Sequence, residues 1–149
     1  MITLKRTTSQ DIDFQNLVRE LDKDLAIRDG DEHDFFHQFN KIDMLRHVVV
    51  AYKKDAPVGC GAIKPYDNVA IEVKRMFVPL EHRGSGVAVA VLHELEHWAK
   101  ELGFGKCILE TGIKMPEAIG LYKKSGYSQT DNYGQYAGVA SSVCFEKSL

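Results

Sequence analysis

A glycine-rich segment, Arg83-Gly84-Ser85-Gly86-Val87-Ala88, lies between a predicted strand and the longest helical pattern of the chain. Glycines at such a turn let backbone N–H groups approach a ligand closely. The N-terminus of the following helix adds a partial positive charge, and Arg83 adds a full one. The segment therefore predicts a binding site for an anion such as a pyrophosphate, although a glycine-rich turn without a ligand is the open alternative.

Two known pyrophosphate motifs do not fit this segment. A Walker A loop needs Lys followed by Ser or Thr after its last glycine, and the chain has neither there. A dinucleotide-binding fingerprint needs a third glycine where Val89 stands, and it opens the first strand–helix unit of a parallel sheet. Here about four predicted strands joined by short turns come first. The sequence therefore disfavours a nicotinamide-dependent enzyme.

A second motif, His93-Glu94-Leu95-Glu96-His97, has the H-E-x-x-H spacing of zinc metallopeptidases. Glu117 follows twenty residues after His97 and is a conceivable third ligand. At about 100° per residue, however, the apolar stripe of this helix points away from His97. We therefore expect a solvated polar face and no bound metal, with a zinc metallopeptidase as the alternative enzyme class.

The chain has 149 residues, 44% hydrophobic and 27% charged, which is ordinary for a globular protein. We expect one domain over residues 1–149. The net charge of −2 provides no basic surplus to attract nucleic acid or an anionic membrane. Cys60, Cys107 and Cys144 form no C-x-x-C pair, and no segment reads as a signal peptide or a membrane span. These features favour a cytoplasmic protein without disulfides.

Hydrophobic periodicity predicts the elements that would position these motifs. Strands are expected at 2–5, 47–52, 58–63, 69–78, 107–109 and 143–145. Helices are expected at 10–27, 84–102 and 116–124, and a short helix or lid at 32–40. The alternation within 69–78 puts Glu72 on one face with Met76 and Val78, and puts Arg75 on the other face with Phe77.

Residues 76–88 resemble the acetyl-CoA-binding motif of the GNAT N-acetyltransferases. Arg83, Gly86 and Ala88 match its R/Q-x-x-G-x-G/A signature. Downstream, residues 117–127 are similar to the family's A-x-x-L-Y-x-x-x-G-F/Y segment, whose tyrosine is Tyr122 here. The order and spacing of the predicted elements fit the family over essentially the whole chain.

The resemblance implies an α/β fold, with a mixed, mostly antiparallel sheet of six or seven strands flanked by about four helices. Its two central strands would splay apart. It also implies direct transfer of an acetyl group from acetyl-CoA to a primary amine of a small molecule or amino acid. A non-catalytic acyl-CoA-binding regulatory module is the alternative from another class. Small members of the family often dimerise, so a homodimer is expected.

The family arrangement assigns the cofactor contacts. The pyrophosphate of coenzyme A would lie on the backbone N–H groups of residues 83–88, and the pantetheine arm would pair with residues 76–78. The N–H of Phe77 or Val78 would polarise the thioester carbonyl. The expected cofactor-binding residues are Met76, Phe77, Val78, Arg83, Gly84, Ser85, Gly86, Val87 and Ala88.

Two proton transfers need residues as well. Glu72, eleven residues before Arg83, approximates the position of the family's catalytic glutamate and is the expected general base, with Glu110 or water alone as the alternatives. Tyr122 occupies the family's tyrosine position and would donate a proton to the leaving thiolate.

The acceptor pocket is expected from four further residues. Arg75 could bind a substrate carboxylate with two hydrogen bonds. Tyr133 and Tyr136 belong to a Gly/Tyr-rich loop that we expect beside the acceptor, and Phe36 comes from the early polar segment.

Overall fold

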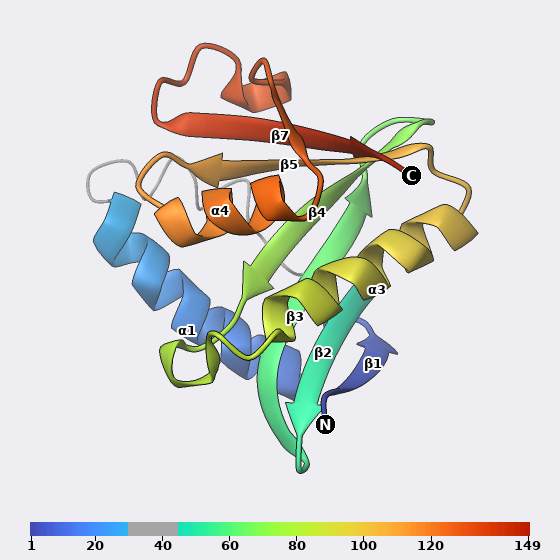
Figure 1. Cartoon of the computed structure of the whole chain (residues 1–149), viewed down its shortest axis with the longest axis vertical. Helices are drawn as coiled ribbons and strands as arrows, with labels where there is room; N and C mark the ends of the chain where they lie inside the picture. The colour runs from blue at the N-terminus through green and yellow to red at the C-terminus, as the bar shows by residue number, and fades with distance from the viewer. Residues whose placement is uncertain (30–44) are drawn as a thin grey trace.

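The computed structural model describes residues 1–29 and 45–149 (Figure 1). The predicted helix at 32–40, with Phe36, lies outside the described residues. Within them, no helix is both long and apolar enough to cross a bilayer.

The described residues form a seven-stranded sheet in the order β1-β2-β3-β4-β5-β7-β6. All neighbouring strands are antiparallel except β4 and β5, which are parallel. The strands are β1 (Thr3–Thr7), β2 (His47–Lys53), β3 (Ala56–Pro65), β4 (Ala70–Phe77), β5 (Lys106–Gly112), β6 (Ser128–Thr130) and β7 (Ser142–Ser148).

Helices cover both faces of the sheet. On one face, α1 (Ile12–Asp29) packs Phe14 and Leu17 against β2 and β3. On the other face lie α3 (Val87–Glu101) and α4 (Pro116–Lys124) (Figure 1). Two 3-10 turns, η2 (Leu80–His82) and η3 (Gly134–Tyr136), complete the described elements.

Local signals explain where the helices begin. The Asp11 carboxylate accepts the N–H groups of Asp13 (2.9 Å) and Phe14 (3.1 Å) and so caps α1. Gly86 precedes α3 with a φ of 85°, which glycine adopts without strain. Pro116 occupies the first turn of α4, where its missing N–H has no helical partner.

The two central strands separate after a short ladder. The strand β4 pairs with β5 only from Ala70 to Glu72. In contrast, β5 pairs with β7 along its whole length, from Lys106 opposite Ser148 to Gly112 opposite Ser142. The predicted splay is confirmed, and it leaves the edge of β4 beyond Glu72 without a strand partner.

A bulge at Arg75 changes the face of the sheet on which the following β4 side chains lie. Cys60 pairs with Phe77 and Ala62 with Lys74, so β4 has one residue more than β3 over this stretch. Arg75 takes up this residue with a φ of 58°, a conformation uncommon outside glycine. As a result Val73 and Met76, three residues apart, both pack on the α3 face.

The predicted alternation along β4 is therefore wrong. Glu72 alternates with Val73 and lies on the face opposite Met76 and Val78, because the bulge shifts the pattern between them. Phe77 packs with the α1 cluster, as Arg75 does through its ion pair with Asp22.

The helix α3 is attached to the sheet on both sides of the splay. Val87 and Val91 pack with the β2 and β3 side chains. Further along, Glu96 accepts hydrogen bonds from the Tyr127 hydroxyl (2.8 Å) and the Lys147 ammonium (2.9 Å), which lie after α4 and on β7. One rigid helix thus connects the two halves of the sheet.

The predicted fold class is confirmed, with small differences. The described residues contain three α-helices, where about four were expected. The short strand β6 was missed because Ser128, Gln129 and Thr130 carry no apolar pattern. The strands β5 and β7 are longer than predicted, since their polar ends still pair with each other.

Gly59 provides a test of the close contact between α3 and β3. A Cβ at Gly59 would lie 2.6 Å from Val87 Cγ1 and 3.3 Å from the Phe77 carbonyl oxygen. Gly59→Ala should therefore lower the free energy of unfolding by about 1–3 kcal/mol in urea titrations. Gly120→Ala is the control, because a Cβ there meets nothing within 4 Å and alanine favours the helix. Unchanged stability of Gly59→Ala would contradict this close contact between α3 and β3.

Candidate functional site

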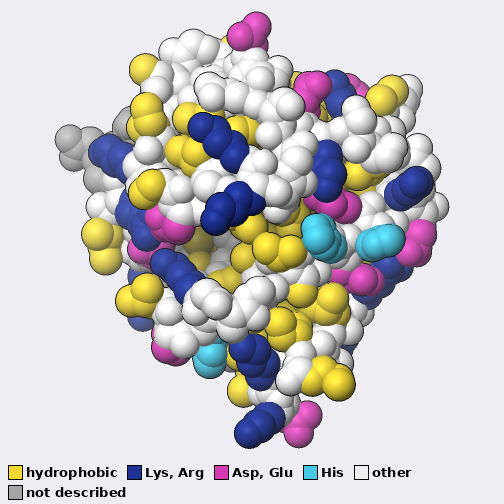
Figure 2. Space-filling view, in the orientation of Figure 1, with side chains coloured by type: hydrophobic (Ala, Val, Ile, Leu, Met, Phe, Trp, Pro, Cys, Tyr) yellow, Lys and Arg dark blue, Asp and Glu magenta, His cyan; other side chains and the backbone are white. Residues whose placement is uncertain are grey.

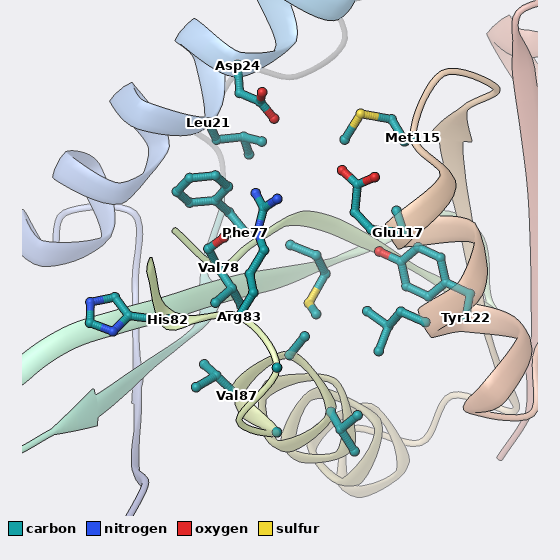
Figure 3. Close-up of a pocket in the computed structure, with 17 residues that line it drawn as sticks. Leu21, Asp24, Phe77, Val78, His82, Arg83, Val87, Met115, Glu117 and Tyr122 are labelled. Atoms are coloured by element: carbon teal, nitrogen blue, oxygen red, sulfur yellow. Dashed lines mark hydrogen bonds between the residues drawn. The ribbon is translucent and has the colours of Figure 1, made fainter. Parts of the chain in front are cut away.

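A cleft of about 300 Å³ opens where β4 leaves β5. It lies between α1, the start of α3, and α4 (Figure 3). Figure 2 shows hydrophobic side chains gathered around a hollow on this face, with Lys and Arg side chains at its rim. The residues predicted to bind the cofactor all line this cleft, except Ser85.

The turn between β4 and α3 presents backbone N–H groups to the cleft. Gly84 and Gly86 have φ values of 80° and 85°, and a Cβ at either would meet nothing within 4 Å, so the space beside them is open. The hydrogen-bond ladder of α3 begins with Ala90 N–H donating to the Gly86 carbonyl (3.1 Å). The preceding N–H groups of the helix lack helical acceptors and carry its partial positive charge. This geometry suits an anion.

Two cationic side chains flank this turn. Arg83 donates from Nε to the Val78 carbonyl oxygen (2.8 Å), and its guanidinium extends into the cleft (Figure 3). The Arg83 N–H donates to the Leu80 carbonyl, so the free amides begin at Gly84. Lys53, which the sequence reasoning missed, donates to Ser85 Oγ (2.8 Å) from the β2–β3 hairpin. It escaped notice because thirty-one residues separate the two along the chain.

A second, smaller cavity of about 100 Å³ continues from the cleft. Met76 and Tyr122 line both spaces and thus mark their junction. The smaller cavity contains four charged residues, Glu72, Lys74, Arg75 and Glu110. The site therefore has an open end beside the helix amides and a compact charged end.

Glu72 is 7% exposed and forms part of the wall of the small cavity. Its carboxylate accepts a hydrogen bond from the Tyr133 hydroxyl and lies 3.7 Å from the Lys74 ammonium. Burial and the neighbouring carboxylate raise the pKa of Tyr133, so its hydroxyl stays protonated and donates. Burial lowers the pKa of Lys74, and the Glu72 carboxylate opposes that effect.

Tyr122 projects from α4 with its hydroxyl directed into the cleft (Figure 3). Burial raises the pKa of this hydroxyl above its ordinary value, and the negative charge of Glu110 adds to the rise. The hydroxyl therefore keeps its proton at neutral pH and can donate a hydrogen bond to an anion that forms beside it.

Of the remaining residues predicted for the acceptor pocket, some line the small cavity and one supports a residue that does. Tyr136 lines the small cavity, whereas Tyr133 supports Glu72 without lining it. Arg75 lines the cavity from the bulge and forms an ion pair with Asp22 of α1. Glu110, the alternative base, lines the same cavity and accepts a hydrogen bond from Ser142 Oγ (2.7 Å).

An ion-pair cluster joins α1 to α4 beside the cleft. Arg28 pairs with Asp24 (3.2 Å) on its own helix and with Glu117 at the start of α4. Both carboxylates line the cleft, and Arg28 offsets their negative charge. The sequence offered no signal for this contact, because a pairing between residues 28 and 117 requires the folded chain.

The H-E-x-x-H motif does not enter the cleft. His93 and His97 are exposed on α3, and Glu94 pairs with Arg6 of β1 (2.7 Å). Among residues 1–29 and 45–149, no group of three or more His, Cys, Asp or Glu side chains is arranged to hold a metal ion. The polar face predicted for these histidines is confirmed by their exposure.

The three cysteines are buried and unpaired. Burial raises the pKa of Cys60 to about 12, and of Cys107 and Cys144 to about 11, from an ordinary 9.0. The Cys60 thiol also donates to the Arg75 carbonyl (3.5 Å), which the bulge removes from the strand ladder. Thiols in this state are poor nucleophiles.

Comparisons with known proteins agree with this architecture. The family model described as Acetyltransferase (GNAT) family matches residues 14–127. The chain is 35% identical over 102 residues to "IAA acetyltransferase" of Azospirillum brasilense, an alignment that covers 68% of this chain and 67% of that protein.

Two solved structures share the fold over the full chain. A putative acyl-CoA N-acyltransferase from Klebsiella pneumoniae superimposes with a TM-score of 0.83 and 27% identity, covering 100% of this chain and 98% of that one. A GNAT family acetyltransferase from Elizabethkingia anophelis, solved with acetyl-CoA bound, has a TM-score of 0.70 and 18% identity, covering 99% and 98%. At that identity the second comparison shows the fold alone.

The buried thiols predict a specific pH dependence of stability. A thiol pKa raised in the folded state stabilises the fold fully below the unfolded value of about 9. This contribution is lost as the pH rises towards 11 to 12, because only the unfolded chain releases the protons. We expect the free energy of unfolding to fall between pH 8 and pH 10.5, and to fall less in Cys60→Ala. An equal decline in both proteins would contradict the proposed effect of Cys60.

Proposed function

The chain belongs to the acetyltransferase (GNAT) family, and on this basis we propose that it transfers the acetyl group of acetyl-CoA to a primary amine of a small molecule or amino acid. The observation that supports this most directly is the combination of free helix amides, the unpaired edge of β4 and the Tyr122 hydroxyl in one cleft. Each of these three features serves a different part of the reaction.

Acetyl-CoA fits the larger cleft in both charge and shape. The N–H groups from Gly84 to Ala88 and the guanidinium of Arg83 would bind the pyrophosphate. The pantetheine arm is an amide chain and would hydrogen bond to the free edge of β4 at Met76 to Val78. The Val78 carbonyl already accepts from Arg83, which leaves its N–H, or that of Phe77, as the donor to the thioester carbonyl.

The amine must lose a proton before it can attack. A lysine-type ammonium has a pKa near 10.4 and arrives protonated at neutral pH. Glu72 is the proposed base, either directly or through a water molecule, because it lines the small cavity and Tyr133 holds its carboxylate. Glu110 lines the same cavity and is the alternative, as is water alone.

Tyr122 is the proposed acid for the leaving thiolate. It lies at the junction of the two cavities, and its hydroxyl is protonated at neutral pH. The buried, protonated cysteines favour direct attack by the amine over transfer through a cysteine. A non-catalytic acyl-CoA-binding module remains the alternative for a chain that binds acetyl-CoA without turnover.

Several broader expectations accompany this proposal. Residues 1–149 would act as one domain, in the cytoplasm, with a small-molecule amine as the partner. A homodimer is expected from the family, and size-exclusion chromatography with light scattering would measure it.

The first test is binding of acetyl-CoA, followed by isothermal titration calorimetry. Arg83→Met should weaken binding about 10- to 100-fold, because a charge-assisted hydrogen bond to the pyrophosphate is lost. Arg19→Met is the matched control, since this exposed arginine of α1 lines neither cavity and should bind as the wild type does. No heat of binding to the wild-type protein would overturn the proposal.

The second test is the role of Tyr122 in turnover. Tyr122→Phe should lower kcat about 10²- to 10³-fold in a thiol-release assay while leaving the affinity for acetyl-CoA within about threefold. Tyr52→Phe makes the same chemical change outside both cavities and should retain activity. If Tyr122→Phe turns over at the wild-type rate, the hydroxyl is not the acid.

A further inference from the structure

We propose that the acceptor amine also carries a carboxylate, and that Arg75 binds this carboxylate through its Nε–H in the small cavity. This inference rests on the proposed function and specifies its substrate class: an amino acid rather than a simple amine or polyamine. Arg75 would act as a binding residue that fixes the amine near the acetyl group.

Arg75 carries a buried donor that lacks a partner. Its side chain is 2% exposed, and one terminal nitrogen pairs with the Asp22 carboxylate. Its Nε is the only buried side-chain nitrogen or oxygen in the described residues without a hydrogen-bond partner. A buried donor on a charged group destabilises a fold unless something satisfies it. Because Arg75 lines the small cavity, a ligand bound there would be the acceptor once the Arg75 side chain shifts to expose its Nε–H.

The backbone at Arg75 supports a role beyond packing. Its left-handed φ of 58° is unfavourable for a residue with a side chain, and a glycine at this bulge would avoid that cost. Strained residues of this kind persist mainly where the strain serves a site. The bulge here sends the Arg75 side chain towards the small cavity and α1.

The charges of the small cavity match a zwitterion. Its wall contains two carboxylates, Glu72 and Glu110, and two cations, Lys74 and Arg75, the latter also paired with Asp22. The wall therefore offers groups of both signs, and an amino acid brings a carboxylate for Arg75 and an ammonium for the carboxylates. The volume of about 100 Å³ favours a small molecule.

The order of residues along β4 directs the amine to the acetyl group. Arg75 precedes Met76, and Met76 lines both cavities. A carboxylate held at Arg75 therefore leaves the amino group facing the junction, where Tyr122 also lies. The new N–C bond forms there as the C–S bond breaks. The ammonium loses two protons through the base, and the thiolate takes one proton from Tyr122. One of the two protons restores the Tyr122 hydroxyl, so that acetylated amino acid, coenzyme A and one proton are released.

Matched substrate pairs test this inference without any mutation. The twenty standard amino acids are compared with their decarboxylated amines, for example alanine with ethylamine and leucine with 3-methylbutylamine. We expect kcat/KM for the accepted amino acids to exceed that of the paired amines about 10- to 100-fold. Equal rates for both members of each pair, or transfer to none of the amino acids, would overturn the inference.

Arg75→Lys gives a second, independent readout. Lysine keeps the positive charge opposite Asp22 but lacks the Nε–H. It should raise KM for amino acids about 10- to 100-fold, leaving the paired amines and the affinity for acetyl-CoA within about threefold. Arg6→Lys is the control, because Arg6 is ion-paired outside both cavities.

The two proposals fail in distinguishable ways. Equal losses of amino acids and amines in Arg75→Lys, with acetyl-CoA binding intact, would assign Arg75 a structural role and overturn this inference alone. Absence of acetyl-CoA binding in the wild-type protein would instead overturn the proposed function.

Discussion

The short parallel ladder between β4 and β5 controls the rest of the site. It ends at Glu72, while β5 continues along β7. A strand edge inside a sheet normally hydrogen bonds to its neighbour, so the free edge of β4 presents backbone groups to the cleft that another partner can pair with. The helix amides at Gly84 to Ala88 and the α4 tyrosine face the same gap, so the groups that we propose to bind acetyl-CoA converge on this edge of β4.

One extra residue in β4 divides the side chains of this strand between the two cavities. Before the bulge, Glu72 and Lys74 lie on the α1 face; after it, Met76 and Val78 lie on the face of α3. Arg75 itself is held by Asp22, and its carbonyl is satisfied by the Cys60 thiol. The bulge thus lets a single strand contribute charged groups to the small cavity and apolar and backbone groups to the larger one.

Local patterns predicted the turn from Arg83 to Ala88 and the tyrosine of α4, because their signals lie within a few consecutive residues. The face of Glu72 was mispredicted, because strict alternation assumes that the strand contains no inserted residue. A glycine at position 75 would have indicated a bulge, but the residue there is Arg75. The contacts of Tyr133 with Glu72 and of Lys53 with Ser85 join distant parts of the chain. Such pairs depend on strand order, which periodicity alone does not determine.

The attachment of α3 to both halves of the sheet has a consequence for how a ligand enters. Val87 and Val91 hold its first turns on β2 and β3, and Glu96 holds its later part to Tyr127 and Lys147. A helix anchored at two such points resists hinge motion. The separation of β4 and β5 that forms the cleft is therefore already present before a ligand binds. The loss of conformational freedom on binding then falls mostly on the flexible ligand, and the protein itself needs little reorganisation.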